Sequence, residues 1–287
     1  MTEIIKFNKI TIVGAGAIGG WMGVKLAHAG AQVSVLARGE TLAAVQLNGL
    51  QLHTQGPEGW TLLQAQVQAS NHAADLGVQD LVVISLKAPA LASVAAQVGP
   101  LIGPNTVVLT AMNGVPWWFL QGFGGPVANQ SLTSVDPGGA IARALPAPHI
   151  VGGVVHASCS VDAPGVVRHH FGDGLIVGEP IGQDTPRVQA LQALLQQAGF
   201  RGDAIRGMRI TRRTDSGRVA WLALDGRFVL RAREGSGEQT LGPACELGDG
   251  LDRFELRVDL AYPGDNPGTL NINFLAPGDG GVGMNLS

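Results

Sequence analysis

A glycine turn close to the start of the chain restricts the fold more than any other feature of the sequence. An apolar run ending at Val13 leads into Gly14, Gly16 and Gly19, which have the spacing G-x-G-x-x-G, and a helical pattern continues to Ala29. In a strand–turn–helix unit, the first glycine permits the tight turn, the second lets the backbone approach a pyrophosphate, and the third lets the helix pack close to the strand. The turn therefore predicts a dinucleotide-binding α/β domain. A glycine-rich turn that binds nothing is the alternative in a chain with 42 glycines.

The predicted cofactor contacts lie in this turn and in the first residues of the helix. A helix N-terminus offers free N–H groups and a positive dipole end, and both favour phosphate. The residues assigned to the site here are Gly14, Ala15, Gly16, Ala17, Ile18 and Gly19.

Composition excludes several classes of protein. The 287 residues suffice for one large or two medium domains, and a hydrophobic content of 45% provides for sizeable cores. A net charge of −3 gives no basic surplus for nucleic acid, and no apolar run approaches the roughly 18–20 residues of a membrane span. The chain enters its first strand without room for a signal peptide, and Cys159 and Cys245 are too few for a disulfide scaffold. We therefore expect a cytoplasmic protein without nucleic-acid or membrane partners.

Arg38 indicates which dinucleotide would bind. It follows the predicted second strand, Val33–Ala37, at a position where NAD-binding sites usually carry an acidic residue for the ribose 2′-hydroxyl. A guanidinium suits a 2′-phosphate instead, which favours NADP. A solvated arginine without a ligand is the alternative.

Two further polar residues are predicted at the same edge of the sheet. The stretch Asp80–Lys87 is nearly continuously apolar, as in a parallel strand covered on both faces, and ends at Lys87. Asn113 follows another buried strand, Thr106–Thr110. Ligands of such sheets bind at the carboxyl ends of the strands, so Lys87 and Asn113 join the predicted site. The alternatives are a solubilising surface charge for Lys87 and a turn residue for Asn113, which precedes a glycine.

The following segment predicts a meander and then a helix. Val151–Val161, Gly165–Phe171 and Leu175–Gly178 have the pattern of three strands, and a helix starts at Pro186. Within the meander, His156 is interpreted as a hydrogen-bonded core histidine. Adjacent His169 and His170 face opposite sides of a strand, so we predict no metal site.

These motifs together resemble the ketopantoate reductases (2-dehydropantoate 2-reductases) over roughly residues 8–205. The resemblance rests on the glycine turn, Arg38, Ser85-Leu-Lys87 and Asn113–Phe119, and further on the segments Ser134–Pro146, Ala163–His169 and Gly178-Glu-Pro. It implies an NADPH-dependent reduction of a small 2-oxo acid to a 2-hydroxy acid, the reductase step of pantothenate biosynthesis. It also implies that Arg38 and Lys87 hold the adenosine-side phosphate, and that Asn113 lies near the nicotinamide ribose and the substrate. Met112 departs from the family, where a polar residue often precedes the Asn-Gly pair.

The resemblance does not extend to catalysis. In the family, a helical second domain supplies a lysine that donates the proton and a glutamate that helps to hold the substrate. The residues after 205 do not show the pattern of that helical domain, and this chain has no lysine after Lys87. Neither role can therefore be carried over, and the catalytic residues are unknown. Arginine does not replace the lysine, because it keeps its proton near neutral pH. A homodimer is one assembly state that the sequence leaves open, since the family's second domain contributes to assembly.

The remaining residues predict β-structure instead of helices. Val219–Leu224 and Arg227–Ala232 flank an Asp-Gly pair, which is a hairpin signal, and alternating apolar residues predict strands at Phe254–Leu260 and Leu270–Phe274. Pro277–Ser287 is expected to be loose. The segment is interpreted as a β-module, with unrelated sequence appended by rearrangement or a reading error as the alternative.

The sequence thus predicts a doubly wound, mainly parallel Rossmann-type α/β domain with an added antiparallel meander over residues 1–205, followed by a β-rich segment over 206–287. The leading hypothesis is an NADPH-dependent 2-oxo acid reductase, impaired by loss of the catalytic helical domain. The alternatives are a non-catalytic NADP(H)-binding protein and an interaction protein that acts through the β-rich segment.

Overall fold

The computed structural model describes residues 5–56, 59–121, 129–180 and 185–204, and a series of strands between residues 207 and 286. The chain divides into two compact units. The first comprises residues 1–118, 131–179 and 184–204, and the second comprises residues 119–130, 180–183 and 205–287. The boundary predicted at residue 205 stays a prediction.

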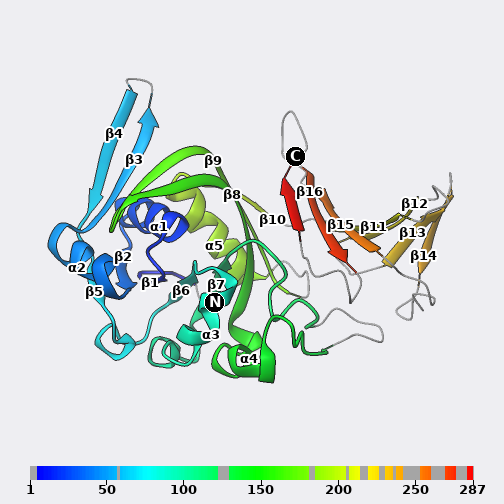
Figure 1. Ribbon diagram of the computed structural model, residues 1–287, viewed down its shortest axis with the longest axis horizontal. Coiled ribbons are helices and arrows are strands. Elements are labelled where there is room, and N and C mark those ends of the chain that lie inside the picture. The colour runs from blue at the N-terminus through cyan, green and yellow to red at the C-terminus, as the bar shows by residue number, and fades with distance from the viewer. Residues whose placement is uncertain are drawn as a thin grey trace. The chain divides into compact units, whose positions relative to one another are not determined.

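The first unit alternates strands and helices in its N-terminal half and carries long strands in its C-terminal half (Figure 1). Its strands are β1 (Lys9–Val13), β2 (Gln32–Leu36), β3 (Leu50–Gly56), β4 (Gly59–Ala65), β5 (Gln68–Ser70), β6 (Leu81–Ile84), β7 (Val107–Ala111), β8 (Ile150–Ala163), β9 (Val166–Gly178) and β10 (Arg201–Ala204). Its helices are α1 (Ala17–His28), α2 (Gly39–Asn48), α3 (Ala88–Ala95), α4 (Ala140–Ala144) and α5 (Pro186–Gln197).

All ten strands form one sheet, which has a parallel half and a half with antiparallel pairs. The strand order is β4-β3-β9-β8-β7-β6-β1-β2-β5, and β10 pairs with β9. The pairs from β8 to β5 are parallel, whereas β8–β9 and β3–β4 are antiparallel. This arrangement confirms the predicted α/β class with an added antiparallel element.

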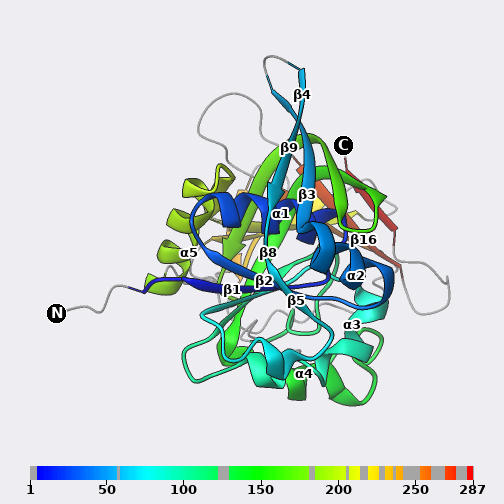
Figure 2. The ribbon, with the colours of Figure 1, turned by 90° about the vertical axis from the view of Figure 1, so that its left-hand side faces the viewer.

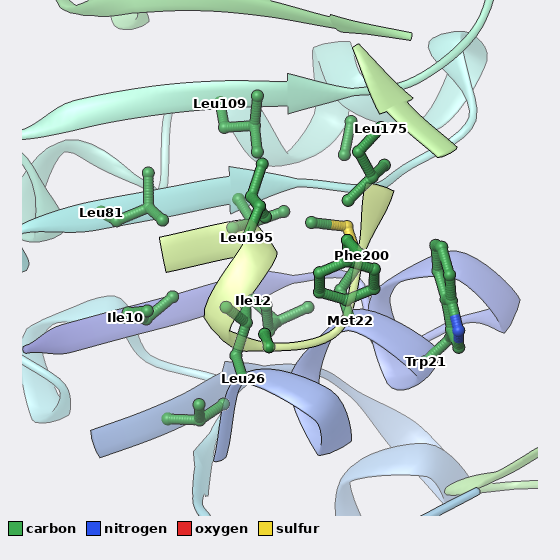
Figure 3. Close-up of a cluster of buried hydrophobic side chains, with 14 of the residues drawn as sticks. Ile10, Ile12, Trp21, Met22, Leu26, Leu81, Leu109, Leu175, Leu195 and Phe200 are labelled. Atoms are coloured by element: carbon green, nitrogen blue, oxygen red, sulfur yellow. The ribbon is translucent and has the colours of Figure 1, made fainter. Parts of the chain in front are cut away.

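Helices cover both faces of the sheet (Figure 2). One apolar cluster joins α1 and α5 to the sheet, and a second joins α3 and α4 to its other face. Figure 3 shows the first cluster, with Trp21, Met22, Leu26, Leu195 and Phe200 packed over Ile10, Ile12, Leu81, Leu109 and Leu175. Because apolar side chains meet them on both faces, β6 and β7 are buried along their whole length.

Two local predictions about strands are wrong in detail. The strand expected over Asp80–Lys87 ends at Ile84, so Lys87 lies beyond it. The meander has two long strands instead of three, because β9 runs without a break through the position where a turn was expected. Gly172 has a φ of 79°, and the register between β9 and β8 shifts around residues 156–159. This β-bulge accommodates the unusual backbone at Gly172, so that β9 continues past it without a turn.

The second unit contains an antiparallel sheet of seven strands. They are β11 (Gly207–Arg213), β12 (Val219–Asp225), β13 (Leu230–Glu234), β14 (Gly237–Leu241), β15 (Arg253–Asp259), β16 (Thr269–Leu275) and β17 (Gly283–Leu286), in the order β14-β13-β12-β11-β15-β16-β17.

The β-rich character predicted for this part of the chain is confirmed. The hairpin β12–β13 pairs Leu224 with Leu230, and β15 pairs with β16. The intervening residues 226–229 lie outside the described residues. The terminal segment expected to be loose contains β17, so that prediction is wrong for residues 283–286, which gain a partner in β16. Among the described residues, no helix is both long and apolar enough to cross a membrane.

Candidate functional site

The predicted site residues all follow strands that end at one edge of the sheet. The register places Leu36, Val13, Ile84 and Thr110 in one row across β2, β1, β6 and β7. The glycine turn, Arg38, Lys87 and Asn113 each begin one to three residues beyond this row. The parallel sheet therefore brings four segments that are far apart in the sequence to a common edge.

Two of the three glycines leave no room for a side chain. A Cβ on Gly19 would lie 2.0 Å from the carbonyl oxygen of Gly14 and 2.3 Å from Oγ of Ser85. Gly14 has a φ of 95°, and a Cβ there would lie 2.4 Å from Cδ2 of Leu86. These contacts let α1 start directly against the ends of β1 and β6.

Gly16 differs from both because its Cβ would meet no atom within 4 Å. It is the N-cap of α1, it is exposed, and the first turn of the helix carries no acidic residue. Its neighbours Ala17 and Ile18 are half-buried, whereas Ala15 points into the core and is 7% exposed. The N-terminus of α1 is thus open to solvent at Gly16, the glycine at which a pyrophosphate would come close to the protein backbone.

The two predicted cationic residues each precede a helix. Arg38 is the N-cap of α2 and Lys87 is the N-cap of α3, and both side chains are exposed. Neither forms an ion pair with another residue in the described part of the chain. Glu40 lies in the first turn of α2, close in sequence to Arg38. Both cations are therefore available to an anionic ligand.

Asn113 has a structural role that the sequence did not reveal. Its Nδ2 donates to the carbonyl oxygen of Val155 at 3.0 Å, and its Oδ1 accepts from the Val155 amide at 2.9 Å. Since β7 pairs with β8 only as far as Ala111–Gly153, this side chain continues the ladder by one more pair. One N–H and one lone pair of the amide remain for a ligand.

Ser85 is a site residue to which sequence reasoning assigned no role. Its hydroxyl donates to the carbonyl oxygen of Gly14 at 2.7 Å and so fastens the glycine turn to the end of β6. A small polar residue directly after a buried parallel strand, next to a strand that ends in a glycine turn, is the signal that could have identified it.

The histidines and the cysteine of the antiparallel half lie in separate surroundings. No group of three or more His, Cys, Asp or Glu side chains is placed to hold a metal ion among the described residues. His169 stacks on Trp21 with ring centroids 5.4 Å apart, whereas Nε2 of His170 lies 2.9 Å from Oγ of Ser160. The two adjacent side chains therefore have separate surroundings, as the strand alternation predicts.

Burial controls the titration of two residues on β8. Nε2 of His156 is buried without a hydrogen-bond partner among the described residues, so the expectation of a hydrogen-bonded histidine is wrong for this nitrogen. Burial also lowers the pKa of His156. For Cys159, burial and then the nearby Asp173 carboxylate raise the thiol pKa from its usual 9.0 to about 12, although Lys25 opposes the shift. Cys159 is therefore protonated at neutral pH and is not a nucleophile.

The carboxyl edge has the features that a dinucleotide requires. It combines an open helix N-terminus, a turn that requires glycine, and two cations, after β2 and β6, that have no ion-pair partner among the described residues. The absence of side-chain volume at Gly16, together with the crowding at Gly14 and Gly19, fits the close approach of a pyrophosphate.

Comparisons with known proteins agree with this geometry. Residues 10–117 match the family model described as ketopantoate reductase PanE/ApbA. A 2-dehydropantoate 2-reductase of Mesorhizobium japonicum is 46% identical over 193 residues, which are 67% of this chain and 58% of the relative. The chain thus spans less than two thirds of the length of this curated relative.

Solved structures give the same result. A protein described as a candidate ketopantoate reductase from Ralstonia solanacearum is 48% identical with a TM-score of 0.66, and the match covers 69% of this chain and 60% of that one. A 2-dehydropantoate 2-reductase from Geobacter metallireducens is 29% identical with a TM-score of 0.55 over 69% of this chain and 58% of that one. The first unit, which holds the residues matched by the family model, is therefore similar to the ketopantoate reductases.

Proposed function

We propose that the first unit binds NADP(H) at the carboxyl edge of its sheet. The observation that carries this proposal is the contrast among the three glycines: Gly14 and Gly19 exclude a side chain, while Gly16 faces open space at the N-terminus of α1. The pyrophosphate would lie over Gly16, Ala17 and Ile18, where the first N–H groups of the helix have no intrahelical acceptors. Ser85 would hold the turn in place through the Gly14 carbonyl.

Arg38 and Lys87 would select the phosphorylated form of the cofactor. Both are exposed and neither is paired with an acid in the described part of the chain, so a 2′-phosphate would not have to displace an existing partner. A guanidinium can bind a phosphate through two parallel hydrogen bonds, which a ribose hydroxyl cannot match.

We further propose that the chain takes part in the reduction of a small 2-oxo acid, as the names of its relatives suggest. When bound, the nicotinamide would supply the hydride. Asn113 is held against β8 through both Val155 contacts, and its remaining amide N–H and lone pair would face the ribose or the substrate. No residue of this chain is assigned as the proton donor.

A second candidate function is nucleotide binding without turnover. It is favoured by one observation: the sequence contains no lysine after Lys87, so the proton donor that the resemblance implies has no counterpart. A missing donor is costly because the developing alkoxide lacks stabilisation.

The test is a titration of the purified chain with NADPH and with NADH, repeated with Arg38→Ala and with Lys9→Ala. Lys9 is exposed at the start of β1, at the opposite edge of the sheet, so its variant removes the same charge away from the site. We expect Arg38→Ala to weaken NADPH binding by roughly 10- to 100-fold, from the loss of a charged hydrogen bond, and to leave NADH almost unchanged. Equal losses for both nucleotides, or an equal loss in Lys9→Ala, would contradict the assignment.

Turnover separates the two candidates. NADPH oxidation is followed with ketopantoate as the 2-oxo acid, at nucleotide concentrations that saturate the chain in the titration. Oxidation that depends on ketopantoate supports the reductase. Saturated binding without oxidation favours the second candidate and leaves the cofactor site intact.

A further inference from the structure

Among the described residues, nothing protects the edge strand β4 against pairing with another strand. It lies at one end of the sheet, next to β3 alone, and its seven residues include no charged side chain. Proteins usually guard such edges with charges, prolines or bulges. Instead, Trp60 and Leu62 are 49% and 48% exposed.

The backbone of β4 presents its free groups at these same two residues. The register pairs Gly56 with Gly59 across a two-residue connection, and the closing pair of such a hairpin is of the hydrogen-bonded kind. Hydrogen-bonded and non-hydrogen-bonded pairs alternate along an antiparallel ladder, so Trp60, Leu62 and Gln64 direct their N–H and C=O groups away from β3. The contact between Nε2 of His28 and the Gln64 carbonyl oxygen, at 3.1 Å, agrees with this assignment.

The Trp60 ring is already held in place. The guanidinium of Arg168 lies 4.8 Å from its centroid, and Arg168 is in turn paired with Asp162 through an Nε–Oδ2 contact of 2.8 Å. A side chain that is ordered before association loses less entropy when it becomes buried. Trp60 is thus an exposed aromatic residue whose side chain is already ordered before any partner binds.

We propose that β4 pairs with β4 of a second copy of this chain, antiparallel, about a two-fold axis at Thr61. In this register, Trp60 lies opposite Leu62 of the second copy in a hydrogen-bonded pair, and the same contact recurs across the axis. The Gln64 carbonyl oxygen already contacts His28, so the part of β4 with unpaired backbone groups is short and has Thr61 at its centre. Such an edge can pair with a copy of itself. Because β4 carries no charged side chain, two copies of it would not repel each other.

The contact is small compared with the roughly 800 Å² per partner of a standard interface. The dimer should therefore be weak and depend on concentration, with a dissociation constant on the order of 10–100 µM. This proposal does not depend on cofactor binding or on turnover.

Sedimentation equilibrium of the full chain, over a concentration series that spans this range, tests the proposal with Leu62→Lys and Leu47→Lys. Leu47 is 79% exposed on α2, so its variant makes the same substitution outside the edge. We expect Leu62→Lys to weaken dimerisation at least tenfold, because two like charges meet near the axis, and Leu47→Lys to behave as wild type. A monomeric wild-type chain, or equal dimerisation in all three proteins, would overturn the proposal. Far-ultraviolet circular dichroism verifies that each variant is folded.

A crosslink tests the register independently. The two copies of Thr61 would form a non-hydrogen-bonded pair with Cα atoms about 4.5 Å apart, which suits a disulfide. Thr61→Cys in a Cys245→Ala background should give a covalent dimer with oxidised glutathione, whereas Leu47→Cys in the same background should not. A dimer that Thr61→Cys fails to trap would overturn the proposed axis.

Discussion

The two halves of the first sheet use their side chains differently. In the parallel half, β1, β6 and β7 are buried on both faces, and only the loops at their carboxyl ends reach solvent. In the antiparallel half, the β3–β4 hairpin extends beyond the other elements of the unit in both views (Figure 1, Figure 2), and it exposes Trp60 and Leu62. The parallel half holds the backbone groups of the proposed cofactor site, whereas the antiparallel half holds the edge strand of the proposed dimer.

The largest effect should come from the parallel half. Gly19→Ala forces a Cβ to 2.0 Å from a backbone oxygen that cannot move away easily, so we expect a loss of about 3 kcal/mol in the free energy of unfolding. Gly16→Ala is the matched control, since its Cβ meets open space, and it should cost less than about 1 kcal/mol. Urea unfolding measures both.

The same pair of variants sharpens the assignment of the ligand. Gly16→Ala should fold normally and still lose NADPH affinity, because the added methyl group stands where the pyrophosphate approaches. Unchanged affinity in this variant would show that the open space at Gly16 is not used. Equal unfolding free energies for the two variants would show that Gly19 is no more crowded than Gly16.

A smaller effect is expected where the two halves meet. Asn113→Ala removes both contacts to Val155 and leaves a backbone donor and acceptor of β8 without these partners, so we expect a loss of about 1–3 kcal/mol in the free energy of unfolding. Asn105→Ala, at an exposed turn before β7, is the control. If both variants unfold alike, the amide of Asn113 does not join the halves.

The smallest effect concerns pH and lies in the antiparallel half. Burial lowers the pKa of His156, so the unfolded chain takes up a proton more readily than the folded one. Its contribution to stability is therefore present above the usual histidine pKa of 6.5 and is lost as the pH falls below it. His156→Leu should flatten the decline of the unfolding free energy between neutral and mildly acidic pH, and exposed His72→Leu should not. A decline of the same steepness in His156→Leu would assign the acid sensitivity to other groups.

The sequence predicted the parallel half better than the antiparallel half for a physical reason. Strands buried on both faces leave continuous apolar runs, and the glycine spacing defines the turn that follows β1, so order and edge could be inferred from local patterns. The length of β9 depends on Gly172 and on a bulge in its pairing with β8, which are features of two strands together. The same holds for the Asn113–Val155 contact and the Ser85–Gly14 contact, because each joins residues far apart in the chain.

The protonated thiol of Cys159 has a consequence for how the protein withstands oxidation. Peroxides and disulfides react with the thiolate, and with a pKa of about 12 this form is scarce at any physiological pH. The strand that carries Val155 and His156 therefore keeps a sulfur atom that resists sulfenic acid formation while the fold is intact. Oxidation of Cys159 would then indicate that the chain had unfolded. In a Cys245→Ala background, the rate of alkylation of Cys159 would therefore measure how often this sheet opens.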